Sequence, residues 1–239
     1  MTNDIYTRTE LLLQPEGLQK LRQSHVLVVG LGGVGGYAAE QLCRSGIGNL
    51  TLVDGDVVSE TNINRQIIAL HSTIAQPKAE VLKSRLLDIN PECHLHIVNE
   101  FIRDDRMIEI LESDHFDYVV DAIDTLSPKV FLLYHCVQRN LRVVSSMGSA
   151  GKMDPSQVYI SDISKSSVCP LAAMVRKRLH RMGITQGIQV VYSTEKVPQY
   201  AMIEDISQNK RTTIGTISYM PPIFGCCCAS VVIRSLSQI

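Results

Sequence analysis

The stretch at residues 26–54 restricts the fold of this chain more than any other. Apolar runs at 26–29 and 50–53 flank a helical pattern, as expected of two buried parallel strands joined by a helix. The turn into that helix reads GLGGVG and fits G-x-G-x-x-G, whose glycines let backbone N–H groups approach a phosphate at a helix N-terminus. Asp54 follows the second run, where a carboxylate can accept hydrogen bonds from ribose hydroxyls. The stretch therefore predicts a β-turn-α-β unit that binds a nucleotide.

Four glycines of this turn are the predicted phosphate-binding residues: Gly30, Gly32, Gly33 and Gly35. A tight turn with a purely structural role is the alternative, because a glycine motif alone is a weak signal. The complete unit around the motif favours nucleotide binding.

The rest of the chain continues the alternation of strands and helices that is typical of a doubly wound, mostly parallel sheet. Further strands are expected at 95–98, 118–122 and 142–145, and helices at 78–89, 106–111 and 130–139. An N-terminal helix at 9–22 should be interrupted near Pro15. We expect one α/β, Rossmann-like domain over 1–239, with a nucleotide-binding half at about 24–150 and a substrate-facing half at about 151–239. The second half should be a C-terminal extension of mixed strands, helices and a mobile loop at 199–211.

Composition limits the class of protein and its compartment. The 239 residues carry a net charge of −1, so a polyanion would have to bind at local patches. The seven cysteines include no C-x-x-C pair, which argues against a four-cysteine zinc site and fits a reducing cytoplasm. Residues 1–20 lack the apolar core of a signal peptide.

One apolar stretch, residues 217–233, approaches the length of a membrane span. Pro221, Pro222 and Gly225 interrupt it, and its continuous portion is about half the ~20 residues that a membrane span needs. We expect a buried core segment, with membrane association as the alternative. Cys226, Cys227 and Cys228 lie within it and are expected to be buried.

Polar residues after the second strand form a candidate ligand loop. Asn62, Asn64, Arg65 and Gln66 lie on the side of the sheet where open α/β folds bind ligands, although a loop stabilised by its own asparagines is equally consistent. Lys78 opens the next helix, where the helix dipole disfavours a cation, and this indicates an anionic partner.

Two carboxylates lie at the end of the strand expected at 118–122. Asp121 and Asp124 are of the type that holds Mg²⁺ beside substrate phosphates, and capping of the next helix by Asp124 is the alternative. A basic helix at 171–182 could contact a nucleic-acid backbone or simply be a solvated face. Its candidate tRNA contacts are Arg176, Lys177, Arg178 and Arg181.

These motifs together resemble the adenylating superfamily that includes ubiquitin-activating enzymes and the ThiF and MoeB proteins. The shared pattern comprises the GLGGVGG turn, Asp54, the loop NINRQ, Lys78 and DAIDT. Within the superfamily the chain is most similar to the tRNA threonylcarbamoyladenosine dehydratases. That likeness covers nearly the whole chain and includes Arg8-Thr9, NRQIIALHSTIAQPKAEV, INPEC, DAIDTLSPK, the loop 148–155, PLAA at 170–173 and YSTE at 192–195.

The resemblance implies an activity. ATP would adenylate the carboxylate of a threonylcarbamoyl group on an adenosine next to a tRNA anticodon, and ring closure would release AMP. It further implies ATP and Mg²⁺ as cofactors, no zinc, a tRNA substrate and a homodimer, and it leaves a monovalent cation and a sulfur-transfer or carrier protein open. The alternative is adenylation of the C-terminal glycine of a ubiquitin-like sulfur-carrier protein. The first β-turn-α-β unit alone would also allow a nicotinamide-dependent dehydrogenase.

Roles for single residues follow from the same resemblance. The glycine turn would surround the ATP phosphates, Asp54 would bind the ribose, and Asp124 would hold Mg²⁺ with Asp121 as a supporting neighbour. Arg8, on sequence grounds an ordinary surface arginine, would reach the ATP of the partner in a dimer. Catalytic roles are implied for Arg8, Arg65, Lys78 and Asp124. Nucleotide contacts are implied for Gly30, Gly32, Gly33, Gly35, Asp54, Asp56, Asn62, Arg65, Lys78, Asp121 and Asp124.

The chain departs from the family pattern at two places. Residues 210–214 lack the cysteine that some members carry in this region, which argues against a sulfur relay. Cys169 stands where the family more often has a polar residue.

Overall fold

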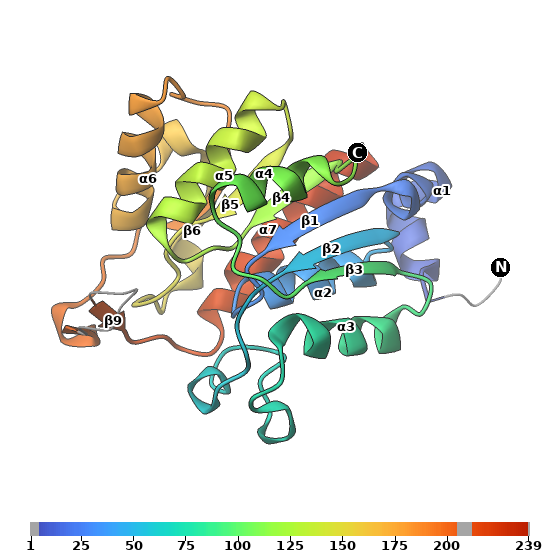
Figure 1. Cartoon of the computed structure of the whole chain (residues 1–239), viewed down its shortest axis with the longest axis horizontal. Coiled ribbons are helices and arrows are strands. Elements are labelled where there is room, and N and C mark those ends of the chain that lie inside the picture. The colour runs from blue at the N-terminus through green and yellow to red at the C-terminus, as the bar shows by residue number, and fades with distance from the viewer. Residues whose placement is uncertain (1–4, 205–211, 239) are drawn as a thin grey trace.

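A seven-stranded sheet forms the centre of the protein in a computed structural model that describes residues 5–204 and 212–238 (Figure 1). The strand order is β3-β2-β1-β4-β5-β7-β6, and only β6 runs antiparallel to its neighbour. In chain order the strands are β1 (His25–Val29), β2 (Asn49–Val53), β3 (His94–Val98), β4 (Tyr118–Asp121), β5 (Val143–Ser146), β6 (Val158–Asp162) and β7 (Gln189–Ser193). The predicted doubly wound, mostly parallel α/β sheet is confirmed.

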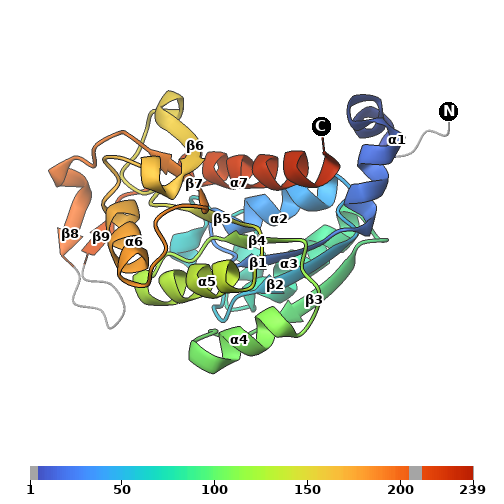
Figure 2. The same ribbon diagram turned by 90° about the horizontal axis from the view of Figure 1, so that it is seen from above.

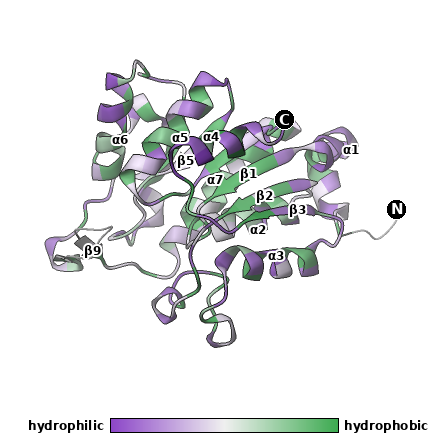
Figure 3. Ribbon diagram, viewed as in Figure 1, coloured by the Kyte–Doolittle hydropathy of each residue, from purple (hydrophilic) through white to green (hydrophobic). Residues whose placement is uncertain are grey.

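Helices cover both faces of this sheet, as Figure 2 shows. One face carries α1 (Thr7–Gln23), α2 (Gly35–Arg44), α3 (Lys78–Ile89) and α7 (Met220–Ser237). The other carries α4 (Asp104–Glu112), α5 (Leu126–Gln138) and α6 (Pro170–Arg181). Successive residues of β1 alternate between the two buried layers, so that Val28 packs on the first face and Leu27 on the second. Burial on both faces explains why the central strands β1 and β4 read as apolar runs (Figure 3).

Helix α7 lies beside α2 and forms the middle of the first layer. A buried stripe at every fourth residue, from Met220 through Phe224 and Cys228 to Leu236, faces the core. A Cβ on Gly225 would lie 2.4 Å from the carbonyl oxygen of Val34, so glycine permits this close helix contact. The expected core segment at 217–233 thus corresponds, from Met220 onward, to a helix with one face in the core. Within the ranges described, α7 is also the one helix long and apolar enough to span a membrane, and half of it is buried in this fold.

Two segments test the expectations for the N-terminal helix and for the loop at 199–211. The interruption expected in the N-terminal helix is present, because Gln14, which precedes Pro15, has non-helical angles of φ 59° and ψ 163°. In the segment expected to be a loop at 199–211, residues 199–201 instead form a 3₁₀ turn and Met202–Glu204 form β8. Strand β8 pairs with β9 (Thr212–Ile214), a pairing that local composition does not indicate. Residues 205–211 lie outside the described part of the chain.

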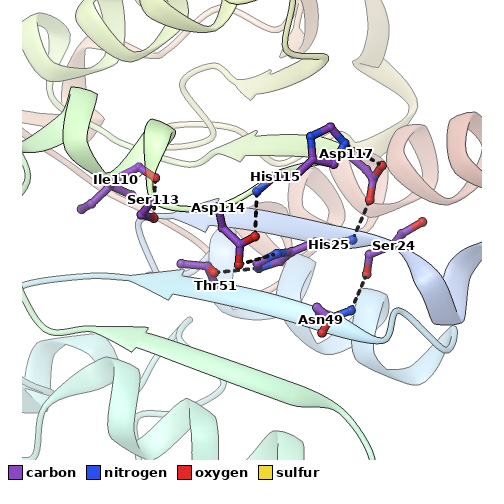
Figure 4. Close-up of polar contacts among 9 residues, drawn as sticks. All are labelled: Ser24, His25, Asn49, Thr51, Ile110, Ser113, Asp114, His115 and Asp117. Atoms are coloured by element: carbon purple, nitrogen blue, oxygen red, sulfur yellow. Dashed lines mark hydrogen bonds and ion pairs between the residues drawn. The ribbon is translucent and has the colours of Figure 1, made fainter.

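The amino ends of the strands are joined by a polar cluster around His25 (Figure 4). Its Nε2 lies 2.8 Å from Thr51 Oγ1 on β2, and its Nδ1 lies 3.4 Å from Asp114 Oδ2 on the loop before β4. The backbone N–H of His25 donates to Asp117 Oδ2 at 2.8 Å. Burial lowers the pKa of His25 below its usual value. The cluster secures the sheet edge opposite the carboxyl ends described next.

Candidate active site

The carboxyl ends of the parallel strands open into a cavity of about 1340 Å³. The strand order reverses between β1 and β4, and open α/β sheets bind ligands at such a switch point. Its walls come from the segments after β1, β2, β4 and β5, from one face of α6, and from β9. The predicted ligand side of the sheet therefore coincides with this cavity.

The glycine turn between β1 and α2 forms the floor of the cavity, called the glycine floor below. Gly30 has φ +88°, and a Cβ there would lie 2.8 Å from the carbonyl oxygen of Ala122, so only glycine fits comfortably. Gly30, Gly32 and Gly33 line the cavity. Gly35 acts differently, because a Cβ on it would lie 1.7 Å from the carbonyl oxygen of Gly30, which makes it a packing residue of the turn.

Asp54 fixes the glycine turn from the end of β2 and lines the cavity. Its Oδ2 accepts a hydrogen bond from the backbone N–H of Leu31 at 2.6 Å, and its Oδ1 accepts one from Asp56 N at 2.8 Å. Burial raises the pKa of Asp54 above its usual value. The carboxylate is thus positioned by backbone donors at the mouth of the turn.

Lys78 is 6% exposed and reaches the cavity wall from the first turn of α3. Its Nζ lies 2.8 Å from Asp56 Oδ2, and both residues line the cavity. The anionic partner indicated by the position of this lysine is therefore, within the chain, the Asp56 carboxylate. The pair places a cation next to the glycine floor.

Of the polar residues in the loop after β2, some stabilise the loop itself and others line the cavity. Asn62 is buried, and its Oδ1 accepts the backbone N–H of Ser59 at 3.1 Å, so it stabilises the loop and does not line the cavity. Arg65 lines the cavity, and its Nη1 donates to the carbonyl oxygen of Thr61 at 2.9 Å and to Asn64 Oδ1 at 2.8 Å. Asn62 therefore stabilises the loop and Arg65 lines the cavity, and ligand binding by this loop stays a prediction.

Gln66, the last residue of the candidate ligand loop, also lines the cavity. It is 8% exposed, and its Oε1 has no hydrogen-bond partner among the residues described. A buried amide without a partner beside the glycine floor suits a ligand that supplies one. The sequence signal for Gln66 was its place in the polar loop after the second strand.

The structure separates the two carboxylates that follow β4. Asp124 lines the cavity, whereas Asp121 is fully buried and is not a lining residue. Asp121 Oδ2 lies 2.6 Å from the Nζ of Lys129, which is itself 0% exposed. Asp121 can thus support Asp124 only through the backbone, where its Oδ1 accepts the N–H of Ile123 at 3.1 Å.

The basic residues of α6 also divide. The Nη1 of Arg176 donates to Ser166 O at 2.8 Å and to Ser166 Oγ at 2.6 Å, so this arginine ties α6 to the preceding segment. Arg178 lines the cavity together with Leu171 and Met174, on one helix face. Lys177 is exposed and lies outside the cavity lining, as does Arg8 on α1 in this single chain.

The three cysteines of α7 differ in exposure because successive helical residues face different directions. Cys228 is buried and Cys227 is half-buried, but Cys226 is exposed, so the expectation of burial is wrong for Cys226. Burial raises the pKa of Cys228 well above its usual value. Cys169 is buried in the core of the second face.

Comparisons with known proteins match these features along the chain. The ThiF family matches residues 6–239. A tRNA threonylcarbamoyladenosine dehydratase of Bacillus subtilis is 45% identical over 190 residues, 80% of this chain and 74% of that protein. The solved E. coli tRNA N6-threonylcarbamoyladenosine dehydratase TcdA in complex with ATP is 34% identical, with a TM-score of 0.89 over 98% of this chain and 93% of the other. Its complex with AMP gives a TM-score of 0.87 over 97% and 93%. The resemblance inferred from the motifs is confirmed.

Proposed function

This chain belongs to the ThiF family, and from that premise we propose that it is an ATP-dependent tRNA threonylcarbamoyladenosine dehydratase. A carboxylate oxygen of the threonylcarbamoyl group attacks the α-phosphorus of ATP, and pyrophosphate leaves. A nucleophilic atom of the same group then attacks the activated carboxyl carbon, and AMP leaves as the ring closes. The observation that carries the proposal is the full-length likeness to a dehydratase solved with ATP. A tRNA substrate is consistent with the cytoplasmic location expected from the sequence.

Each part of ATP meets a group suited to it in the cavity. Gly30, Gly32, Gly33 and Asp54 line the cavity, and we assign the backbone N–H groups of the glycine turn to the phosphates and Asp54 to the ribose. Lys78 and Arg65 neutralise the negative charge that develops as the α-phosphate is attacked. Groups held in place before the reaction stabilise such charge best, and each is typically worth about 3–4 kcal/mol. The ion pair with Asp56 provides that fixed position for Lys78.

Charge balance supports Mg²⁺ as a second component. The cavity is lined by five carboxylates and four cationic side chains, so it does not favour a triphosphate by itself: Asp54, Asp56, Glu100, Asp104 and Asp124 against Arg65, Lys78, Arg103 and Arg178. Mg²⁺ is usually bound through one or two carboxylates plus substrate phosphates, and Asp124 is the carboxylate we assign to it. When bound, the ion would neutralise phosphate charge and favour the departure of pyrophosphate.

The N-terminal helix fits a homodimer. Ile5, Leu11 and Leu12 are 67%, 64% and 77% exposed on and next to α1, an apolar surface that a second copy would cover. We assign Arg8, on the same helix, to the ATP of the partner subunit. Arg8→Ala should then lower the rate of AMP formation in a protein that remains dimeric by light scattering. A full rate in that variant would contradict the assignment.

The proposal is tested by incubating the protein with ATP, Mg²⁺ and threonylcarbamoylated tRNA, with unmodified tRNA in parallel. AMP should be formed from ATP only when the modified tRNA is present. Mass spectrometry should then show that the modified nucleoside has lost one water. Asp124→Asn should abolish both signals. The matched control, Asp88→Asn, makes the same change at an exposed residue outside the cavity and should leave both intact.

The same assay distinguishes the alternatives. ATP hydrolysis without a change in the tRNA base would contradict the proposal. Pyrophosphate exchange that depends on a small protein ending in Gly-Gly would favour carrier-protein activation. Binding of NADH without binding of ATP would favour a dehydrogenase.

A further inference from the structure

A second groove, of about 480 Å³, runs between α5 and α6 and joins the active-site cavity. It is lined by Ser127, Val130, Phe131, Arg178, Arg181 and Met182. Ser127, Phe131 and Arg178 also line the cavity, so the two hollows share a wall. A substrate larger than the nucleoside that enters the cavity can therefore extend along α5 and α6.

The groove combines two cationic groups with an apolar floor. Arg178 and Arg181 lie three residues apart on α6, which places both on one helix face. Val130, Phe131 and Met182 supply the apolar surface, and none of the six lining residues is acidic. Two like charges at this spacing repel each other slightly, and an anion lying between them would remove that cost.

Arg178 is held at the junction of the two hollows. Its Nη1 donates to Ser127 Oγ at 2.9 Å, and this is its one hydrogen bond within the described chain. Since a guanidinium has five N–H donors in a planar fork, several remain for an anionic ligand. Arg176, by contrast, is bonded to the carbonyl oxygens of Ile163 and Ser166, and Lys177 lies outside both hollows.

We propose that the groove between α5 and α6 binds the RNA strand that flanks the modified adenosine. Arg178 and Arg181 contact backbone phosphates, and Phe131 and Met182 provide a surface against which a neighbouring base packs. The inference rests on the proposed function, because it takes the nucleotide in the cavity to be part of an RNA. It narrows the RNA contacts expected along the basic helix to the two arginines that face the groove.

The test measures binding of a threonylcarbamoylated anticodon stem-loop at several KCl concentrations, in the presence of ATP and Mg²⁺. Arg178→Gln/Arg181→Gln should weaken binding about a hundredfold or more at 150 mM KCl, as expected for two charged hydrogen bonds. The slope of log Kd against log salt should fall by about 1.4, because each single-stranded phosphate contact contributes about 0.7. The matched control, Lys165→Gln/Lys177→Gln, removes two charges from exposed positions outside the groove and should change neither value beyond a small field effect.

Thermal unfolding and ATP affinity show whether each variant keeps its fold and its nucleotide site. The inference is overturned if the groove variant binds RNA with the wild-type slope, or if the control loses as much affinity. The inference is also overturned if the groove variant binds RNA normally but no longer binds an acidic protein that the wild-type protein binds. Failure of the proposed function looks different: the wild-type protein would bind the stem-loop but release no AMP.

Discussion

Replacing Lys129 by methionine should destabilise the protein strongly, although Lys129 lies outside the cavity. Its ammonium is fully buried and donates to Asp121 Oδ2 at 2.6 Å, Ser145 Oγ at 3.1 Å and Ser146 O at 2.9 Å. The side chain thus joins α5 to the carboxyl ends of β4 and β5. Methionine keeps most of the volume, so the main loss is the charge and its three hydrogen bonds.

The magnitude follows from the carboxylate that remains. Asp121 would keep its bonds from Ser145 Oγ and Ile123 N but would be a buried, unpaired anion. Removing one partner of a buried ion pair costs about 3–5 kcal/mol. At about 2–4 °C per kcal/mol for a chain of this size, Tm should fall by roughly 6–20 °C.

A second variant separates charge from packing. Asp121→Asn/Lys129→Met removes both charges, and the asparagine can still accept the N–H of Ile123. Since a buried ion pair replaced as a whole is often nearly neutral in stability, the double variant should cost less than Lys129→Met alone, below about 2 kcal/mol. The ion pair, not the shape of the side chains, then accounts for the difference.

Urea unfolding at pH 7 measures both changes, provided that the m-value stays constant. The control Lys177→Met makes the same substitution at an exposed position and should stay within about 0.5 kcal/mol of the parent. A cost below about 1 kcal/mol for Lys129→Met, or a double variant that costs the sum of both single changes, would refute the reasoning. If Lys129→Met does not fold, the double variant still decides the question.

Three further predictions concern the cavity and the opposite edge of the sheet. Lys78→Met should lower the rate of AMP formation by about 10²–10³, measured at saturating ATP, because the fixed cation that we assign to the α-phosphate is lost. Gly35→Ala should abolish ATP binding in calorimetry, since its Cβ would overlap the carbonyl oxygen of Gly30. Because burial holds the pKa of His25 below 6.5, the unfolded chain takes up that proton first, so the free energy of unfolding should fall as pH drops from about 7 through the lowered pKa. His25→Gln should flatten this dependence in urea titrations, and an unchanged slope would contradict the assignment.

The fold could be predicted because its signals are local. Each buried strand is a short apolar run, each helix has its own period, and the glycine turn fixes the first crossover. The candidate site residues on the turns after β1, β2 and β4 could also be predicted to lie close together, because the carboxyl ends of parallel strands meet at one edge of the sheet. Lys129 could not be found in this way. In the sequence it looks like an ordinary helical lysine. Its burial depends on Ser145 of β5, which is 16 residues away in the sequence and is brought next to it by the fold.

Distant contacts also explain the division of the basic helix. Arg176 and Arg178 are equally basic in sequence, but the segment before α6 folds back and presents the carbonyl oxygen of Ser166 to Arg176. Arg178 instead meets the start of α5. The pairing of β8 with β9 is another case, since it joins segments separated by residues outside the described structure. Helical spacing predicts which residues share a face, but only the packing of neighbours decides which face meets the ligand.

The glycine turn alone does not decide between a dinucleotide and a triphosphate, because both present phosphates to the same backbone groups. The segment after β2 makes the distinction. In a dinucleotide fold it needs only the acidic residue for a ribose, whereas here it also brings Arg65 and Lys78 to the cavity. Burying a lysine costs several kcal/mol of desolvation, and the carboxylates of Asp56 and Asp54, which both interact with Lys78, offset part of this cost. An apolar residue at 78 would avoid the cost, so a buried cation at this position supports the proposal that an anionic ligand binds beside it.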